Sequence, residues 1–411
     1  MIIINKPSII RKDDRIRFQS RIVDEAQNVD ADIWYETSSS NEQYFDDTNA
    51  DGFLVLMLLS AAKNQQDIVV KASISEKLFY GVINYVYPIL LTAYNKKQGG
   101  RIIPDKISKR EYKPIAIATG CSLGVDSFSS ILHHIGPDCL ENYALTHLTY
   151  FNVGAMGSVC DDGTESSFFK DLNMISKFAE NIKLPVIWVN SNVHQLFKGF
   201  SFNASHTFRN MSVVLSLPNL FEKYYYASGF CFSDYKIDRK DFGKFEDVIL
   251  SHLCTETTTL YSDDATLTRF QKTEYIKDSE LVQKHLYVCL KEQIKNDDKD
   301  APEVFNSSKT MNCSRCEKCL RTLLALDILG VLPSFGSIFD IIYYYHIKPY
   351  FIAKVISQRT KSEYYKDLMF NMKSRSFRIP FVSYLLSPFY NIYLGFSKLK
   401  IHKSILNTIR K

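Results

Sequence analysis

The sequence predicts an α/β protein built on a parallel sheet with helices on both faces. Between residues 106 and 335, short apolar and β-rich runs alternate with segments of helical spacing, as crossover connections between parallel strands require. The first of these runs, residues 115–119, breaks into a loop of small residues and then resumes as a helix. Ligands of such sheets bind beyond the carboxyl ends of the strands, so this loop is the first candidate site.

Length and composition predict two or three domains. The 411 residues are 45% hydrophobic and 23% charged, which is typical of globular proteins and excludes disordered and fibrous classes. We expect an N-terminal α+β unit over 1–105, the α/β domain over 106–335 and a basic, aromatic-rich helical region over 336–411. The polar segment 95–101 marks the first boundary.

The N-terminal unit shows no catalytic constellation, and scaffolding or substrate recognition are both open for it. We expect strands around 15–18 and 33–35, followed by two apolar segments, 53–62 and 78–94. The last segment holds 17 uncharged residues, which is short for a membrane span, and Pro88 interrupts it. A buried helix is therefore predicted.

The beginning of the chain and its cysteines predict a cytoplasmic location. The opening MIIINKPSIIRKDDR becomes charged too early for a secretory signal. The nine cysteines are odd in number, and three are separated by only two residues. Such crowding favours a metal site over disulfides.

Seven further elements follow from the pattern in the α/β domain. The expected strands are Ile115–Thr119, Leu145–Asn152, Val186–Asn190 and Tyr224–Ser228, and the expected helices are Ser127–His134, Glu165–Asn181 and Phe208–Lys223.

The loop over 120–127, GCSLGVDS, has the composition of an anion site. Amide groups of a strand–loop–helix junction point at a ligand, and the helix dipole adds partial positive charge. No Lys follows the glycines, so the loop is not a Walker loop, and the G-x-G-x-x-G spacing is absent.

Two shorter motifs admit both structural and functional interpretations. Arg209 and Asn210 open an apolar helix and could be a solvated arginine and a cap, or could bind a phosphate or carboxylate and a substrate amide. Lys272 lies near a helix that we expect to begin at Lys272 or Thr273, and together with Arg269 it could bind an anion or form a charged surface turn.

Three cysteines predict a metal knuckle. Cys313, Cys316 and Cys319 are spaced C-x2-C-x2-C and run into a helix over 320–329. A structural zinc requires four ligands. Our first choice for the fourth is Cys289, in a strand-like run over 286–290 that precedes a looped insertion over 291–310.

Two questions about this site stay open. Cys254 and Cys231 are alternative fourth ligands. An iron–sulfur cluster can use the same spacing, but nothing else in the sequence suggests redox chemistry, so zinc is favoured.

Taken in order, these motifs resemble a known family. Ser-x-Gly-Val-Asp-Ser, an Arg-Asn pair, Lys-Thr-Glu and a cysteine knuckle followed by Arg occur in this order in the 7-cyano-7-deazaguanine synthases, which belong to the PP-loop ATP pyrophosphatases. The resemblance covers residues 113–330. It implies a Rossmann-like adenine nucleotide alpha hydrolase core that binds ATP, Mg²⁺ and Zn²⁺.

The resemblance also implies roles for individual residues. Asp126, Ser127, Arg209 and Lys272 would be catalytic, with Asp126 the carboxylate associated with Mg²⁺. The ATP-binding residues would be Ser122, Gly124, Val125, Asp126, Ser127, Asn152 and Asn210, and the zinc ligands Cys289, Cys313, Cys316 and Cys319.

This sequence departs from the family at two places. Leu123 stands where the family usually has a second glycine. We expect the leucine to be tolerated if its φ stays negative, and the alternative is that it reshapes the pyrophosphate cradle. The family's substrate-contacting stretch, Asp-Tyr-Ser-Gly-Tyr-Pro-Asp-Cys-Arg, is represented only by residues 234–239, DYKIDR. The resemblance therefore implies nucleotide chemistry and leaves the substrate open.

The predicted function is ATP-dependent adenylation of a carboxyl or carbonyl oxygen of a small molecule, 7-deazaguanine-like or other, for nitrogen transfer. One alternative is a sulfur-transfer enzyme acting on tRNA, with Cys121 or Cys160 as the reactive thiol. Another is a nucleotide-binding adaptor without turnover in a defence or polysaccharide operon, with which Leu123 is consistent.

The C-terminal region carries the basic excess. Residues 341–411 hold 13 Lys/Arg and two Asp/Glu, which leaves 37 basic and 43 acidic residues in the first 340. A helical subdomain with a basic outer face, a peripheral contact of the uncharged stretch 379–396 with an anionic membrane, and RNA binding all fit this composition. Pro380 and Pro388 argue against a transmembrane helix.

Overall fold

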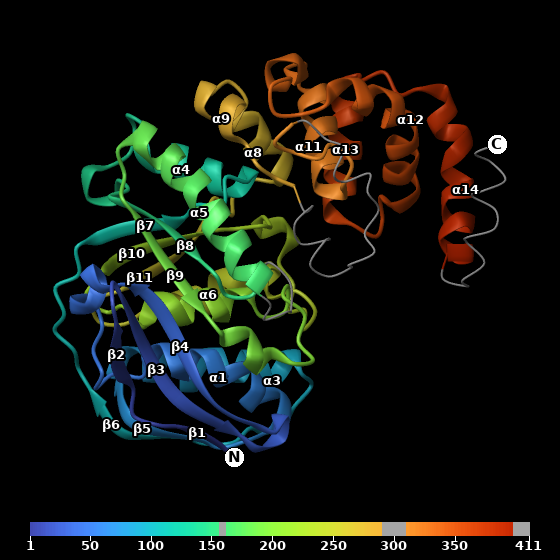
Figure 1. Ribbon diagram of the computed structural model, residues 1–411. Coiled ribbons are helices and arrows are strands. Elements are labelled where there is room, and N and C mark those ends of the chain that lie inside the picture. The colour runs from blue at the N-terminus through green and yellow to red at the C-terminus, as the bar shows by residue number, and fades with distance from the viewer. Residues whose placement is uncertain (156–161, 290–309, 398–411) are drawn as a thin grey trace. The chain divides into compact units, whose positions relative to one another are not determined.

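The structure is a computed structural model that describes residues 1–155, 162–289 and 310–397 (Figure 1). The chain divides into two compact units. The sheet unit comprises residues 1–266, and the helical unit comprises the described residues from 267 onward. The boundary expected near residue 105 falls within the sheet unit, and the one expected near residue 335 falls within the helical unit.

The sheet unit is organised around one 11-stranded sheet with the order β11-β10-β7-β8-β9-β4-β3-β1-β5-β6, in which β2 pairs with β3. Its strands are β1 (Ile2–Ile4), β2 (Ser8–Lys12), β3 (Arg15–Asp24), β4 (Val29–Ser38), β5 (Ile68–Ser75), β6 (Ile102–Ser108), β7 (Ala116–Gly120), β8 (His147–Phe151), β9 (Val186–Ser191), β10 (Phe221–Ala227) and β11 (Thr259–Asp263).

The expected parallel sheet is confirmed in the strands β7 to β11. These five strands are mutually parallel and lie in the order β9-β8-β7-β10-β11, a Rossmann-like arrangement in which the chain leaves the central β7 first to one side and then to the other. The point where the direction reverses lies between β7 and β10.

The helix expected over 208–223 is wrong at its carboxyl end. The helix α6 spans His206–Leu215, and residues 221–227 form β10 instead. Pro218 disfavours helical conformation in the residue before it, and the aromatic run that follows suits the centre of a sheet, where it pairs with β7 and β11. The strand β11 was not expected.

The N-terminal strands extend the same sheet. Antiparallel β4 pairs with β9 through Tyr35–Ser191 and Glu36–Asn190. Side chains strengthen this short joint, because Thr37 Oγ1 donates to the carbonyl oxygen of Trp188 at 2.6 Å. The α+β part and the parallel part therefore share one sheet.

Helices cover both faces of the sheet (Figure 1). Along β7, Ala118 packs into the apolar core that includes α1 and α6, whereas Thr119 Oγ1 lies 3.3 Å from Ser130 Oγ of α4. The segment expected to be one helix over 78–94 is α2, a π-turn over Val82–Val86 and α3. The helices of this unit are α1 (Asp51–Asn64), α2 (Glu76–Gly81), α3 (Tyr87–Ala93), α4 (Val125–Ile135), α5 (Asp162–Ile182), α6 and α7 (Glu246–His252).

The helical unit contains the cysteines of the knuckle. Residues 286–289, expected as a strand, follow α9 without regular structure, and the expected insertion over 291–310 lies almost entirely outside the described residues. Among the described residues, no helix is both long and apolar enough to cross a membrane. The helices are α8 (Arg269–Ile276), α9 (Glu280–His285), α11 (Glu317–Ile328), α12 (Ile341–Gln358), α13 (Glu363–Ser374) and α14 (Phe381–Ser397).

Candidate functional site

The loop between β7 and α4 is held by its own serines. Ser127 Oγ donates to the carbonyl oxygen of Gly120 at 2.7 Å and accepts from the amide of Ser122 at 3.2 Å. Ser122 Oγ in turn accepts from the amide of Gly124 at 3.3 Å. Ser127 therefore ties the end of the strand to the start of the helix, while the exposed Ser122 keeps a hydroxyl hydrogen for a ligand.

The amino terminus of α4 is the part of this loop that could bind an anion. The residue that precedes the helix is Gly124, so no side chain caps the first-turn amides of α4. Uncapped amides at a helix start donate readily to anions. Of the residues that open the helix, Val125 is buried in the core and Asp126 is half-buried.

Leu123 does not have the negative φ under which we expected a leucine to be tolerated here. Its φ is +56°, in the left-handed region, and its side chain is fully buried. A leucine in this region is strained by about 1 to 2 kcal/mol, because its Cβ approaches the following carbonyl group. The position has the backbone geometry of a glycine, and packing of the leucine side chain maintains it.

The neighbouring strand ends supply polar groups. Asn152 follows β8, and its Nδ2 donates to Oδ1 of Asn190 at 2.8 Å. The carbonyl oxygen of Asn152 accepts from Ser191 Oγ at 2.6 Å. Asn152 thus links the carboxyl ends of β8 and β9 in the same unit as the loop.

Arg209 is a buried cation in the sheet unit. Its Nε donates to Ser205 Oγ at 2.9 Å and its NH1 to the carbonyl oxygen of Val153 at 3.0 Å, and its guanidinium lies 4.2 Å from the ring centre of Phe197. No carboxylate of the described residues pairs with it, and burial lowers the pKa of Arg209 to about 10. A buried arginine without an acidic partner suits an anionic ligand.

Asn210 lies in a cluster at the carboxyl end of β10. Its Nδ2 donates to the carbonyl oxygen of His206 at 2.8 Å and to Tyr226 Oη at 3.4 Å. His206 Nδ1 lies 2.7 Å from the same hydroxyl. Burial, with a smaller contribution from Arg209, lowers the pKa of His206 to about 4, so this histidine is neutral at pH 7. Neither His206 nor Tyr226 was among the predicted site residues.

Lys272 belongs to the helical unit, whereas the loop belongs to the sheet unit. The helix that carries it begins at Arg269, three residues before the expected start, because Thr268 caps it: Thr268 Oγ1 accepts from the amide of Gln271 at 3.3 Å. Lys272 is therefore inside the helix rather than at its start, and its side chain is buried.

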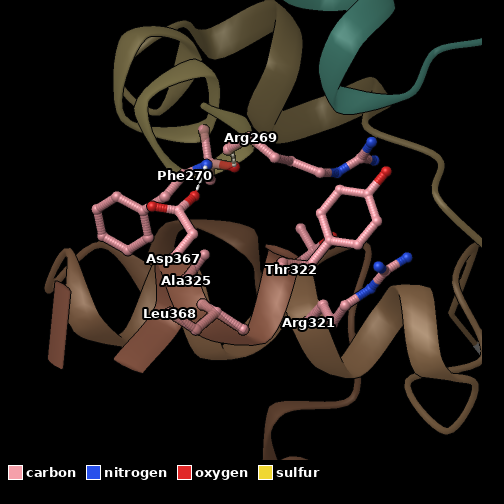
Figure 2. Close-up of a pocket in the computed structure, with 9 residues that line it drawn as sticks. Arg269, Phe270, Arg321, Thr322, Ala325, Asp367 and Leu368 are labelled. Atoms are coloured by element: carbon pink, nitrogen blue, oxygen red, sulfur yellow. Dashed lines mark hydrogen bonds between the residues drawn. The ribbon is translucent and has the colours of Figure 1, made fainter. Parts of the chain in front are cut away.

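A pocket next to Lys272 contains Arg269, which the sequence pattern had already paired with Lys272, and Arg321, which was not assigned a role (Figure 2). Figure 2 shows the guanidinium groups of Arg269 and Arg321 at the same end of the pocket. They lie 6.0 and 4.2 Å from the ring centre of Tyr364. The pocket is lined by Arg269, Phe270, Thr273, Arg321, Thr322, Ala325, Tyr364, Asp367 and Leu368.

Arg321 brings a buried positive charge to this end of the pocket. Arg321 Nε is buried without a hydrogen-bond acceptor, and no carboxylate of the described residues pairs with Arg321. Burial, and after it the charge of Arg269, lower the pKa of Arg321. Asp367 Oδ2 accepts from the amide of Phe270 at 3.1 Å. In the sequence, the signal for Arg321 is its position two residues after the last knuckle cysteine.

The four predicted cysteines form one cluster in the helical unit. Their sulfur atoms all lie within 4.8 Å of one another, and the sulfurs of Cys313 and Cys319 are 3.8 Å apart. Four thiolates about 2.3 Å from a common zinc ion would be separated by about 3.8 Å. The cluster could therefore hold a metal ion such as zinc, and Cys289 is its fourth member. The alternatives Cys231 and Cys254 belong to the sheet unit.

Backbone amides orient the sulfurs. The amides of Arg315 and Cys316 donate to Cys313 Sγ at 3.4 and 3.3 Å, and the amide of Cys313 donates to Cys289 Sγ at 3.3 Å. Hydrogen bonds among the thiols, that of Cys289 foremost, lower the pKa of Cys316 to about 7 and raise that of Cys319. Amide donors favour thiolates, which are the ligand form.

Of the two thiols proposed for sulfur transfer, the structure describes only Cys121. Cys121 is buried, and burial raises the pKa of its thiol to about 12. A thiol of this kind is a poor nucleophile at neutral pH. Cys160 lies outside the described residues.

Comparison of the chain with protein-family models, with curated proteins and with solved structures gave no match.

Proposed function

We propose that the chain is an ATP-dependent enzyme of the PP-loop type, similar to the 7-cyano-7-deazaguanine synthases. One observation carries the proposal: the Ser-x-Gly-Val-Asp-Ser loop joins β7 to an uncapped helix, beside the point where the strand order of the sheet reverses. Parallel sheets bind ligands at such points. The buried Arg209 in the same unit adds a cation for a phosphate or carboxylate.

In the proposed reaction, a carboxyl or carbonyl oxygen of the substrate attacks the α-phosphorus of ATP, and the bond to the β-phosphate breaks. Pyrophosphate leaves, a nitrogen nucleophile then attacks the activated carbon, and AMP leaves. The first-turn amides of α4 and the Ser122 hydroxyl would donate to the departing pyrophosphate, whose charge grows as the bond breaks. Ser127 holds the loop in shape.

Other residues of the proposal act around the loop. Asp126 is the carboxylate for Mg²⁺, which would neutralise phosphate charge. Arg209 would bind an anionic group of nucleotide or substrate, and Asn210 and Asn152 would hydrogen-bond nucleotide or substrate. The resemblance also assigns Lys272, which belongs to the helical unit, to the phosphates.

We further propose that the cysteine cluster holds a structural zinc. Four thiolates complete its coordination and leave no position for substrate, and three of the sulfurs belong to deeply buried cysteines. The mutual distances suit one ion better than an iron–sulfur cluster, whose cysteines surround a larger group.

Release of pyrophosphate and AMP tests the proposal. The full chain would be incubated with Mg-ATP and a small-molecule cell extract, and we expect both products in equal amounts. Asp126→Ala should reduce the rate by at least about tenfold, whereas Asp138→Ala, which removes an exposed carboxylate of the same unit, should not change it. Absence of both products, or equal rates for the two variants, would contradict the proposal.

Leu123 gives the adaptor alternative a specific basis, because a strained leucine replaces a flexible residue in the loop. In that case ATP would bind to the wild-type chain in calorimetry without any release of pyrophosphate. The sulfur-transfer alternative loses support from the buried Cys121. It would require a thiolated tRNA product.

A further inference from the structure

The helix α14 exposes a row of large apolar side chains. It spans 17 residues, Phe381–Ser397, none of them charged. Phe381, Leu385 and Phe389 are 76%, 55% and 63% exposed. Their spacing of four residues places them on one side of the helix. Val382 and Tyr384, beside this row, are exposed as well. We call these five side chains the α14 stripe.

Packing within the helical unit fixes the direction of the α14 stripe. Ser383 is completely buried, and its hydroxyl donates to the carbonyl oxygen of Pro349 in α12 at 2.9 Å. The helix therefore rests on α12 through the face that contains Ser383. The stripe faces outward because the opposite face of α14 packs against α12.

Positive charge borders the stripe. Lys373 and Arg378, which precede the helix, are exposed and make no ion pair among the described residues. The sequence holds no Asp or Glu after Asp367, and the residues that follow the helix, 398–411, contribute five more Lys or Arg. An uncharged apolar row thus lies between two cationic segments of the chain.

We propose that the α14 stripe binds the surface of an anionic lipid bilayer. The apolar side chains would enter the boundary between headgroups and acyl chains with the helix parallel to the membrane, and the flanking cations would contact anionic headgroups. Phenylalanine and leucine provide apolar area, and the hydroxyl of Tyr384 suits the headgroup level.

Charge favours an anionic bilayer over two other possible partners of the α14 stripe, a second copy of the chain and a nucleic acid. A second copy of the chain would bring the same cationic borders together, and like charges oppose such a contact. A nucleic acid requires cations along the contact surface, whereas residues 379–397 contain none. An anionic bilayer satisfies the apolar centre and the cationic borders together.

Vesicle co-sedimentation of the full chain tests the proposal. We expect binding to vesicles of phosphatidylcholine mixed with phosphatidylserine, weaker binding to phosphatidylcholine alone, and loss of the difference at high salt. Replacement of both Phe381→Ser and Leu385→Ser should weaken binding by at least about tenfold. The double replacement of Lys373→Gln and Arg378→Gln should weaken it by about tenfold on anionic vesicles only.

A matched control is available in the sheet unit. Leu140 is 71% exposed and lies near Asp138 and Glu141, so Leu140→Ser removes exposed apolar area without a cationic border. This variant should bind as the wild type does, and thermal melting should show that all variants stay folded. Three results would overturn the proposal: unchanged binding in the Phe381/Leu385 variant, a dimer in sedimentation that this variant dissociates, or RNA binding that it abolishes.

Discussion

The cysteine cluster and the β7–α4 loop differ in how much of a binding site the chain itself provides. In the cluster, four sulfurs within 4.8 Å of one another already define the size and chemistry of the ligand, and backbone amides orient them. In the loop, the chain provides only uncapped amides and a strained turn. Donor chemistry therefore points to a metal ion such as zinc for the cluster, whereas the amides and the turn of the loop do not specify a ligand.

Loss of the fourth cysteine should have the largest effect on the helical unit. Purified chain should contain about one zinc, and Cys289→Ser should lose most of it, because zinc in four-thiolate sites contributes on the order of 10 kcal/mol to folding. Metal analysis and protease resistance of the helical unit are the measurements. Cys231→Ser, in the sheet unit, should keep the zinc. Detection of iron with a visible absorbance band, in place of zinc, would instead indicate an iron–sulfur cluster.

The converse experiment perturbs only the sheet unit. A Cβ atom at Gly52 of α1 would lie 2.1 Å from Ser216 Oγ and 2.3 Å from the carbonyl oxygen of Ser212, both near the end of α6. Gly52→Ala should destabilise the sheet unit by about 3 kcal/mol in denaturant unfolding and leave the zinc content unchanged. A simultaneous Ser216→Ala should not restore stability, since the backbone carbonyl still obstructs the Cβ. Full recovery of stability in the double variant would show that α1 and α6 can move apart enough to admit the Cβ atom.

The sequence was sufficient where local pattern determines structure. Alternation of apolar runs and helical spacing identified β7 to β10, because parallel strands buried on both faces require such runs. The spacing of Cys313, Cys316 and Cys319 identified the cluster, and the search for a fourth thiol led to Cys289. In each case the signal and the structure that it specifies lie within a few residues, or concern a rare residue type.

The sequence was insufficient where distant segments compete. Residues 221–223, expected at the end of a helix, instead begin β10, where they pair with β7 and β11. The positive φ of Leu123 is likewise imposed by burial of its side chain, against the local preference of leucine. Arg321 and Tyr364 come together because α11 and α13 pack in one unit, which no motif records.

Acid should destabilise the sheet unit through His206, at the carboxyl end of β10, by a moderate amount that can be separated from the effect of acid on the cysteine cluster. The pKa of His206 is lowered from 6.5 to about 4 by burial and by Arg209, so the unfolded chain binds a proton more readily than the folded one. Stability should be complete above pH 6.5 and fall by up to about 3 kcal/mol as the pH falls to 4. Acid also releases metal from thiolates, so the readout is the difference between wild type and His206→Gln, whose loss should be smaller. Equal losses would contradict the assignment.

The smallest effect tests the strain in the loop. Leu123→Ala removes a buried side chain but keeps a Cβ at positive φ, whereas Leu123→Gly removes the side chain and the strain together. Both variants should be less stable than the wild type by about 2 to 4 kcal/mol. The glycine variant should be the more stable of the two by about 1 kcal/mol, the reverse of the usual preference for alanine. Denaturant unfolding of the two variants measures this difference directly. An alanine variant as stable as the glycine variant would mean that Leu123 does not hold the left-handed conformation, and the loop would then lack the strain that sets it apart from the cysteine cluster.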